Sequence, residues 1–448
     1  MPQQILVNTS ALNIPSPDGM FHASVTSPPY WGLRKYKGEQ RTDWPSVEYS
    51  PIPGMEPIVI PAQRAALGLE DTPEAYVGHL VLVYREVRRV LRDDGVAWLN
   101  LGDSYGHGTS AERQQGGEKQ QTNVGAHMGR HGGSAGDLLL IPHRVALALQ
   151  ADGWTVRNDN VWSKPNPMPE SVSGWRWERC RVKVKPANMR HSGGIRGNAG
   201  GHFANSLHEY EGPQWSPCPG CDKCRDTGGY VLRRSSWRYT RSHEYIFMLS
   251  KGMGYFCNQE RVREDAVGSG KRNPRGVLEV SPRPYRGAHY AVYPPDLITP
   301  LIRASVPMKC CPKCGAPWAP VVERENMVIR RPGRADETGN RTDASGTMVS
   351  PATSSTIGHR PTCDCQAAPG DPETQVAYNG GDGDSGFWAP TPVPGWCLDP
   401  FAGSGTTLVV CEDVGVNGVG IDISLEYLRS HAKKRVENAK LQPRLFYD

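Results

Sequence analysis

The sequence predicts an α/β fold in which helices cover both faces of a mostly parallel β-sheet. Strand-like and helix-like segments alternate along much of the 448-residue chain, and this alternation is typical of parallel sheets. In addition, residues 395–424 contain a strand, a glycine-rich turn, a helix and a second strand in succession, as nucleotide-binding βαβ units do. Ligands of such sheets bind beyond the carboxyl ends of the strands.

The first elements follow from local patterns. Residues 4–7 and 23–26 are short apolar runs that predict strands around a polar loop. The segment 72–91 predicts a helix, because Thr72 is a favourable capping residue and Pro73 suits the first turn. The apolar residues of this segment share one helical face. An Arg-Asp-Asp-Gly sequence follows and is expected to end the helix.

The later elements alternate in the same way. Strands are predicted at residues 95–103, 155–164 and 242–251. Helices are predicted at residues 138–153, 293–304 and 425–441. Residues 104–136 lack periodicity and predict a mobile loop. Residues 319–395 are rich in Gly, Ser, Thr and Pro, so we expect an extended or disordered insertion there.

Composition narrows the class of protein. The chain is longer than a single hydrophobic core usually supports, so two domains or one domain with large insertions are expected. Its net charge of +5 permits a polyanionic partner without requiring one. No apolar run approaches the roughly 18 residues of a membrane span, and the first residues lack the features of a secretion signal. We therefore expect a cytoplasmic protein without a membrane partner. Because thiols stay reduced in the cytoplasm, its 12 cysteines are expected to bind metal rather than to form disulfides.

Two short stretches carry the chemistry. In "HASVTSPPYWGLRKY" a strand ends in Ser27-Pro28-Pro29-Tyr30, where the proline pair stops the strand and holds one stiff conformation. In "LDPFAGSGTT" a strand ends in a glycine-rich turn that opens a helix. An acid, Asp422, ends the next strand, where a carboxylate can accept both hydroxyls of a ribose. The second stretch therefore predicts a nucleotide-like cofactor.

Together these stretches resemble the amino-group DNA methyltransferases, which pair an (S/D/N)-P-P-(Y/F/W) motif with an F-x-G-x-G motif. The catalytic motif precedes the cofactor motif here, an order that resembles the beta class. The stretches "VWSKPNPMP", "SHEYIFMLSK" and "HYAVYPPDLITPLIRA" extend the resemblance over most of the chain. It implies a Rossmann-like S-adenosylmethionine-dependent methyltransferase fold with a circularly permuted motif order and a target-recognition insertion. The cysteines described below predict that this insertion is zinc-stabilised.

The resemblance also implies a cofactor site. Its residues are the strand-end Asp399, the pocket-lining Phe401, Gly403 and Gly405, and the ribose ligand Asp422. The segment around Pro295 to Leu297 resembles the motif that packs on the methionine end. Many relatives carry an acidic residue in an early stretch where this chain has Asn8, so we expect residues 8–12 to lie outside the site.

The catalytic residues implied are Ser27, Pro28, Pro29 and Tyr30. An exocyclic amino nitrogen is a poor nucleophile, and prepositioned acceptors at the Ser27 hydroxyl and the Pro28 carbonyl would free its lone pair. Tyr30 would stack on the flipped base, and Trp31 would extend that wall. Serine at this position favours cytosine N4 in the family, with adenine N6 as the alternative. The final acceptor of the proton is left open.

The cysteines predict two structural Zn²⁺ sites, because their spacing suits tetrahedral thiolate coordination. The first set comprises Cys180, Cys218, Cys221 and Cys224. The second set comprises Cys311, Cys314, Cys363 and Cys365, with Cys310 as a possible substitute. Each would hold a loop-rich insertion that is too small for its own core.

A basic stretch lies where the family carries its target-recognition region. The residues expected to bind DNA are Arg176, Arg179, Arg181, Lys183 and Lys185, interleaved with Trp175 and Trp177. Neutralisation of phosphates by this patch would make binding fall steeply with salt.

These features predict a sequence-specific DNA methyltransferase that acts on double-stranded DNA in a bacterial or phage-infected cell. A companion restriction endonuclease is a candidate partner. The expected segments are a catalytic half (1–164), a target-recognition and zinc insertion (165–240), a core continuation (241–305), a second zinc knuckle with a flexible insertion (306–395) and a cofactor-binding half (396–448). A non-catalytic, zinc-stabilised DNA-binding protein would explain the cysteines and arginines but not the two motifs. Methylation of protein glutamine or RNA suits the motif order less well.

Overall fold

The computed structural model describes residues 2–32, 40–106, 136–167, 170, 172–184, 214–266, 271–282, 293–325, 328–330, 347–350, 353–365, 375–378 and 387–441. The chain divides into two compact units, one of residues 1–166 with 243–448 and the other of residues 167–242. Most of the predicted loop 104–136 lies outside the described residues. None of the described helices has the length and apolar character needed to span a membrane.

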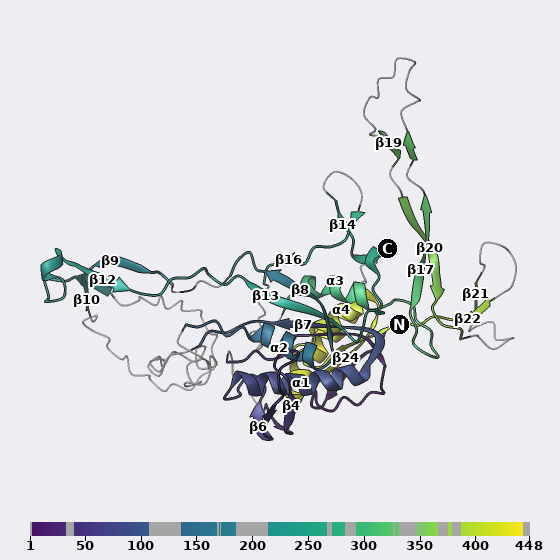
Figure 1. Cartoon of the computed structure of the whole chain (residues 1–448), viewed down its shortest axis with the longest axis horizontal. Coiled ribbons are helices and arrows are strands. Elements are labelled where there is room, and N and C mark those ends of the chain that lie inside the picture. The colour runs from purple at the N-terminus through teal and green to yellow at the C-terminus, as the bar shows by residue number, and fades with distance from the viewer. Residues whose placement is uncertain are drawn as a thin grey trace, which may run out of the picture. The chain divides into compact units, whose positions relative to one another are not determined.

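An eight-stranded sheet forms the centre of the larger unit (Figure 1). In spatial order its strands are β1 (Gln4–Asn8), β24 (Asn417–Asp422), β23 (Trp396–Asp399), β2 (Phe21–Thr26), β7 (Leu91–Leu101), β13 (His243–Ser250), β8 (Thr155–Ser163) and β16 (Val277–Glu279). All neighbouring pairs are parallel except those that β13 forms with β7 and β8. The predicted mostly parallel sheet is therefore confirmed, and the carboxyl ends of β1, β24, β23, β2 and β7 share one edge.

Helices cover both faces of this sheet, as expected. The helices are α1 (Pro73–Val90), α2 (Ile141–Ala151), α3 (Pro295–Ser305), α4 (Thr406–Val414), α5 (Leu425–Tyr427) and α6 (Lys433–Leu441), with a π-helical turn η5 (Leu428–Ala432) between the last two. Alternate residues of β7 point to opposite cores: Ala97 and Leu99 pack with α1 and α2, whereas Val96 and Trp98 pack with α3 and α4. This alternation is the strand periodicity that buries both faces of a sheet.

The predicted cap of α1 is confirmed, and its end differs slightly from the prediction. The Thr72 side chain accepts a hydrogen bond from the Ala75 backbone N–H (3.2 Å). The helix ends at Val90, and β7 begins at once at Leu91 rather than at Gly95. The charged residues Arg92, Asp93 and Asp94 therefore belong to the start of β7, whereas the apolar run predicted only its later, buried part.

Two small sheets between β2 and α1 were not predicted. They pair β3 (Arg41–Trp44) with β6 (Gln63–Ala66), and β4 (Val47–Tyr49) with β5 (Ile58–Ile60). Val47 and Tyr49 pack so closely on α1 that a Cβ at Gly78 would lie 2.9 Å from the Val47 side chain.

The described parts of the insertion at 319–395, expected to be extended or disordered, are extended strands that form antiparallel pairs, and this pairing was not predicted. These are β17 (Trp318–Glu325) with β20 (Thr353–Pro361), β18 (Val328–Arg330) with β19 (Thr347–Ser350), and β21 (Gln375–Tyr378) with β22 (Phe387–Pro390). Cross-strand partners supply these hydrogen bonds, so the local periodicity of each segment did not reveal them. The larger unit also contains η4 (Gln259–Val262) and the pair β14 (Glu264–Asp265) with β15 (Lys271–Arg272).

In the part that the structure describes, the smaller unit (residues 167–242) contains two antiparallel pairs and a short turn of helix. The first pair is β9 (Trp175–Arg179) with β12 (Tyr230–Arg234), and the second is β10 (Arg181–Val184) with β11 (Gln214–Pro217). The helical turn is η3 (Arg225–Thr227).

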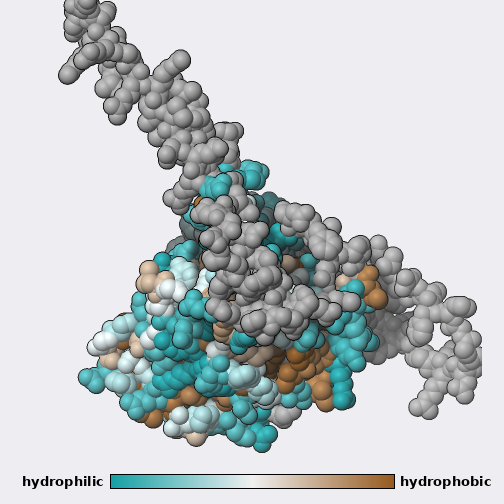
Figure 2. Space-filling model, turned by 90° about the vertical axis from the view of Figure 1, so that its right-hand side faces the viewer, coloured by the Kyte–Doolittle hydropathy of each residue, from teal (hydrophilic) through white to brown (hydrophobic). Residues whose placement is uncertain are grey.

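On the molecular face shown in Figure 2, hydrophilic and intermediate residues cover most of the described surface, and hydrophobic residues lie in separate groups. This distribution agrees with the negative mean hydropathy of −0.54.

Candidate active site and cysteine clusters

The Ser27-Pro28-Pro29-Tyr30 motif begins where β2 ends, at the carboxyl edge of the sheet. Pro28 is buried, whereas Ser27, Pro29 and Tyr30 are partly exposed. The Tyr76 hydroxyl of α1 donates a hydrogen bond to the Pro29 carbonyl (2.9 Å). This bond and the restricted φ of the prolines hold the turn in one conformation.

Tyr30 is the centre of a hydrogen-bond network that sequence reasoning missed. Its hydroxyl donates to Glu244 Oε2 (2.7 Å). The Tyr30 hydroxyl oxygen accepts from Asn100 Nδ2 (2.7 Å) and from Ser27 Oγ (3.1 Å). Lys164, which follows β8, forms an ion pair with the other Glu244 oxygen. A lone asparagine in the apolar run of β7 and an acid at the start of β13 were the available signals.

The Tyr30 ring is held from several sides. A Cβ at position 102 would lie 2.6 Å from the Tyr30 Cε2 atom, so Gly102 is required for the ring to occupy this place. Burial raises the pKa of Tyr30 well above its usual range, and the charge of Glu244 raises it further. Tyr30 is therefore a neutral phenol that donates its proton to a carboxylate.

Trp31 does not extend the wall beside Tyr30, which corrects that expectation. Its side chain is buried in the core shared with α1 and α2, with 3% of its surface exposed. The indole N–H donates to the Glu70 carbonyl (3.0 Å). An aromatic residue next to a site motif is equally suited to anchor the motif to the core.

The glycine-rich turn lies between β23 and α4. Gly403 and Gly405 have φ values of 49° and 76°, a region that glycine adopts without strain. Gly405 caps α4, and a Cβ there would lie 3.0 Å from Ala432 Cβ. Arg435 of α6 donates to the Ser404 carbonyl (3.0 Å), which fixes the loop from outside. Because α4 follows the carboxyl end of β23, its N-terminus lies at the carboxyl edge of the sheet.

Asp399 is buried, with 1% of its surface exposed, and organises this loop from inside. One carboxylate oxygen accepts from Thr26 Oγ1 (2.7 Å) and from the Phe401 N–H (3.1 Å). The other accepts from the hydroxyls of Thr407 and Tyr293. Burial raises the pKa of Asp399, while these donors favour its ionised form. These contacts indicate that Asp399 holds the glycine-rich turn in place from within the core.

The bond between Thr26 and Asp399 joins the two sequence motifs. β2 and β23 are adjacent parallel strands, with Ser24 paired to Leu398. Thr26 immediately precedes Ser27, and Asp399 precedes the glycine loop. Thr26 and Asp399 are 373 residues apart in the chain, so the tertiary fold brings the two motifs together at one edge of the sheet.

Asp422 ends β24 beside the glycine loop. Its two carboxylate oxygens accept from the backbone N–H groups of Gly403 (2.9 Å) and Ser424 (2.7 Å). Burial raises the pKa of Asp422 to about 6. Asn8, which the sequence placed outside the site, is paired with Asp422 in the sheet and donates to the carbonyls of Asp422 and Ile423 (both 2.9 Å). Asn8 thus supports the turn that carries Asp422.

The sulfur atoms of Cys180, Cys218, Cys221 and Cys224 lie within 4.8 Å of one another. Neighbouring sulfurs are 3.7, 3.8 and 4.0 Å apart. Tetrahedral coordination with Zn–S bonds of about 2.3 Å places sulfurs about 3.8 Å apart, whereas a disulfide requires about 2 Å. The donor set and its spacing therefore fit Zn²⁺.

The second cluster brings together Cys311, Cys314, Cys363 and Cys365, again within 4.8 Å. Cys310 is not a member, which corrects its suggested role as a substitute. Its buried sulfur lies 3.3 Å from the His22 Nε2 atom instead. The chemistry of this donor set also fits Zn²⁺.

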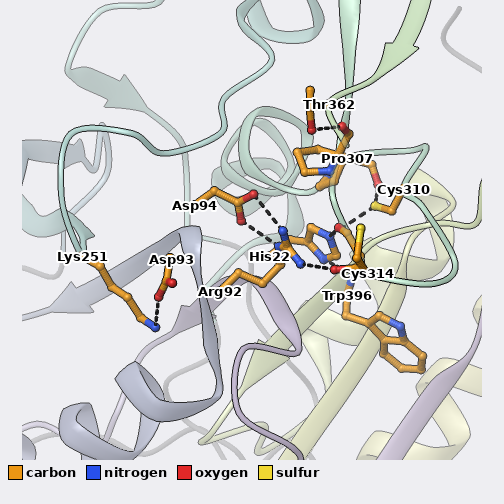
Figure 3. Close-up of polar contacts among 12 residues, drawn as sticks. His22, Arg92, Asp93, Asp94, Lys251, Pro307, Cys310, Cys314, Thr362 and Trp396 are labelled. Atoms are coloured by element: carbon orange, nitrogen blue, oxygen red, sulfur yellow. Dashed lines mark hydrogen bonds and ion pairs between the residues drawn. The ribbon is translucent and has the colours of Figure 1, made fainter. Parts of the chain in front are cut away.

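His22 and Arg92 fasten the second cluster to the sheet (Figure 3). His22 Nε2 lies 2.8 Å from the Gly315 carbonyl, and its Nδ1 accepts from the Trp396 N–H (3.0 Å). Arg92 donates to the Cys314 carbonyl (2.8 Å). Burial lowers the pKa of His22 to about 4, so the imidazole is neutral and donates through Nε2. The cluster is thereby attached at the start of β2 and β23, the strands whose opposite ends carry the two motifs.

The basic residues expected to bind DNA lie on the smaller unit. Arg176, Arg179 and Arg181 are exposed on β9 and β10. Lys183 lies on β10, and Lys185 lies outside the described residues. Arg176 forms an ion pair with Glu178 (2.6 Å).

Exposed aromatics accompany these arginines. Trp175 and Trp177 of β9 are 69% and 57% exposed. The guanidinium of Arg234 lies 4.9 Å from the centre of the Trp175 ring, and that of Arg179 lies 5.7 Å from the Tyr230 ring. One face of the β9–β12 pair therefore presents stacked aromatic and cationic groups to solvent.

Comparison with known proteins decides the family. The sequence profile described as "DNA methylase" matches residues 21–309 and 390–434. The chain belongs to the DNA methylase family. The unmatched residues 310–389 of this DNA methylase contain the second cysteine cluster.

Two relatives illustrate the similarity of this DNA methylase to curated proteins. It is 33% identical over 293 residues to Type II methyltransferase M.XycI of Xanthomonas campestris pv. cyanopsidis, and the aligned region covers 64% of this chain and 67% of the relative. It is 28% identical over 424 residues to Type II methyltransferase M.SmaI of Serratia marcescens, which covers 93% and 84%. Among solved structures, PvuII DNA methyltransferase (cytosine-N4-specific) is 11% identical with a TM-score of 0.41, covering 98% of this chain and 92% of that one.

Proposed function

We propose that this DNA methylase transfers a methyl group from S-adenosylmethionine to the exocyclic amino group of a flipped base in a specific DNA sequence. The observation that carries the proposal is the hydrogen bond from Thr26 to Asp399, which brings Ser27 and the glycine loop to one edge of the sheet. The names of the relatives support assignment to a Type II restriction-modification system. A companion endonuclease follows as a candidate partner, and double-stranded DNA as the substrate.

The residues around the glycine loop fit a nucleoside donor. The backbone at Gly403 and Gly405 has no side chain to obstruct a ligand. The Asp422 carboxylate uses one acceptor site on each oxygen for backbone N–H groups, which leaves further sites for two ribose hydroxyls. Phe401 is partly exposed and could cover the adenine ring. When bound, S-adenosylmethionine supplies an electrophilic methyl group.

Ser27 and Tyr30 suit the amino group that accepts the methyl. An amino nitrogen conjugated to a base is a poor nucleophile, and hydrogen-bond acceptors on its two hydrogens restore its lone pair. The Ser27 hydroxyl is one acceptor, and the Pro28 carbonyl is the other. Because Pro28 is buried and Pro29 is bonded to Tyr76, these acceptors need little reorganisation in the transition state.

Cytosine N4 is the favoured target, with adenine N6 as the alternative. The reason is the serine at position 27, where aspartate accompanies adenine more often in this family. Membership in the DNA methylase family favours an enzyme over the non-catalytic, zinc-stabilised DNA-binding protein.

We further propose a role for the remaining features. Two structural Zn²⁺ ions would each hold one four-cysteine cluster, stabilising segments that have little apolar core. The arginines and exposed aromatics of the smaller unit would contact phosphates and bases of the target duplex.

Methylation-aware sequencing of DNA from cells that express the protein tests the function. We expect one sequence context to carry N4-methylcytosine, and a Ser27→Ala variant expressed at the same level to leave it unmodified. N6-methyladenine would select the alternative base. DNA without any new modification, together with no thermal stabilisation of the purified protein by millimolar S-adenosylmethionine, would refute the enzyme.

A further inference from the structure

We propose that Glu244 is the final acceptor of the proton released by the methylated amino group, and that Ser27 and Tyr30 relay the proton to it. This inference rests on the proposed function. It assigns the one step that the Ser-Pro-Pro-Tyr motif does not explain by itself, because a serine hydroxyl is too weak a base to keep the proton.

The hydrogen bonds form one continuous path. Ser27 Oγ donates to the Tyr30 hydroxyl (3.1 Å), and the Tyr30 hydroxyl donates to Glu244 Oε2 (2.7 Å). Both donors therefore point away from the substrate side and toward the carboxylate. Two buried carboxylates also lie at this edge, Asp399 and Asp103. Asp399 accepts its four hydrogen bonds from groups other than Ser27, and Asp103 accepts from the backbone N–H groups of Ser104 and Ile141.

Asn100 fixes the direction of the path. Its Nδ2 atom donates to Ser27 Oγ (3.3 Å), to the Tyr30 hydroxyl (2.7 Å) and to Glu244 (3.1 Å). A hydroxyl has one donor and two acceptor sites. Tyr30 uses all three of its sites within the network. Ser27 donates to Tyr30 and accepts from Asn100, so one acceptor site is left for a substrate N–H.

Lys164 stabilises the charge of Glu244. It forms an ion pair with Glu244 Oε1, while Oε2 faces Tyr30 and Asn100. The two side chains are only 20% and 15% exposed, so water screens this pair weakly. The ammonium group also lies 4.2 Å from the centre of the Trp162 ring, which holds it in place. The ion pair with Lys164 and the hydrogen bonds from Tyr30 and Asn100 therefore hold the Glu244 side chain in position before the reaction.

The proposed step balances as follows. The amino nitrogen forms a bond to the methyl carbon, the carbon–sulfur bond breaks with its electron pair left on sulfur, and the nitrogen becomes cationic. That nitrogen then gives a proton to Ser27 Oγ, Ser27 gives its own proton to Tyr30, and Tyr30 gives its proton to Glu244. The methylated base leaves neutral, both hydroxyls are restored, and the proton later passes from Glu244 to water.

The test compares Glu244→Gln with two matched variants. The rate of a single turnover is measured on a duplex that contains the methylated sequence, together with the Kd values for S-adenosylmethionine and DNA. Glu244→Gln keeps the size of the side chain but cannot accept the proton, so we expect a loss of about 100-fold or more in rate with both Kd values within about twofold. Lys164→Gln breaks the same ion pair yet keeps the carboxylate, and should lose much less. Glu279→Gln, at an exposed position on the edge strand β16, should match the wild type.

A double-variant cycle distinguishes the relay from a structural role. Tyr30→Phe keeps the ring but removes the relay hydroxyl, and Tyr30→Phe/Glu244→Gln should be no slower than the slower single variant, because both changes interrupt one path. Glu244→Asp should recover part of the rate. Equal losses in Glu244→Gln and Lys164→Gln, additive losses in the cycle, or a Glu244→Gln rate within fivefold of the wild type would each overturn the relay. A wild-type protein without methyl transfer would instead refute the proposed function and the relay with it.

Discussion

Replacing Asp422 with asparagine should weaken the binding of S-adenosylmethionine at neutral pH and remove its dependence on pH. The carboxylate lies at the end of β24, held by the N–H groups of Gly403 and Ser424. In the proposed pocket it accepts hydrogen bonds from ribose hydroxyls. Hydrogen bonds to a charged group are worth about 1.5–3 kcal/mol, so Asp422→Asn should raise the Kd about 10- to 150-fold at pH 7.5.

The raised pKa of Asp422 sets the pH range of the effect. With a pKa of about 6, the carboxyl is almost fully ionised at pH 7.5. At pH 5 about a tenth of the molecules carry the charge, so the wild-type Kd should rise about tenfold between these values. The Kd of Asp422→Asn should stay nearly constant over the same range.

The stability of the ligand-free protein should change in the opposite sense. Because the folded pKa of Asp422 lies above the unfolded value, its contribution to stability is present below about pH 4 and is lost as the pH rises through about 6. A shift of roughly two units corresponds to at most about 3 kcal/mol. Asp422→Asn should therefore unfold at a higher temperature than the wild type at pH 7.5, and at a similar temperature near pH 4.

Titration calorimetry at pH 5, 6 and 7.5 measures the Kd, and differential scanning calorimetry measures unfolding. Glu426→Gln is the matched control, because Glu426 is an exposed carboxylate in the helix that follows Asp422. A wild-type Kd that does not change with pH, or the same change in Asp422→Asn, would refute the reasoning.

Three further predictions concern the other parts of the molecule. Ser27→Ala should lower the single-turnover rate by about 100-fold or more while the Kd for S-adenosylmethionine stays within about twofold; loss of cofactor binding would show a structural role instead. Metal analysis of the purified protein should return close to two zinc ions per chain, and Cys363→Ser should reduce this by about one; the absence of zinc would contradict both clusters. Trp175→Ala should weaken DNA binding by about 1 kcal/mol or more without changing the Kd for S-adenosylmethionine, as measured by fluorescence anisotropy, and unchanged DNA binding would place that face outside the interface.

The sequence predicted those elements that depend on interactions between residues close together in the chain, and it missed those that depend on contacts between separate segments. The helix 72–91 and the strand–turn–helix at 396–414 were predicted because caps, prolines, glycines and apolar periodicity act within a few residues. The pairs β17–β20 and β3–β6 were missed because each strand is specified by a partner elsewhere in the chain. The role assumed for Trp31 failed for a related reason, since adjacency to a motif does not show which way a side chain points.

The sequence by itself determined the family resemblance, the mostly parallel sheet, the two motifs and the two sets of cysteines. Those features depend on residue identity and spacing, which are local and chemically restrictive. Only the tertiary structure decided that Asn100 and Glu244 meet Tyr30, that Asp399 is buried under four donors, and that Asn8 supports Asp422. These contacts join different strands at one edge of the sheet, and no local pattern encodes them, because a hydrogen bond depends on where two side chains arrive in space.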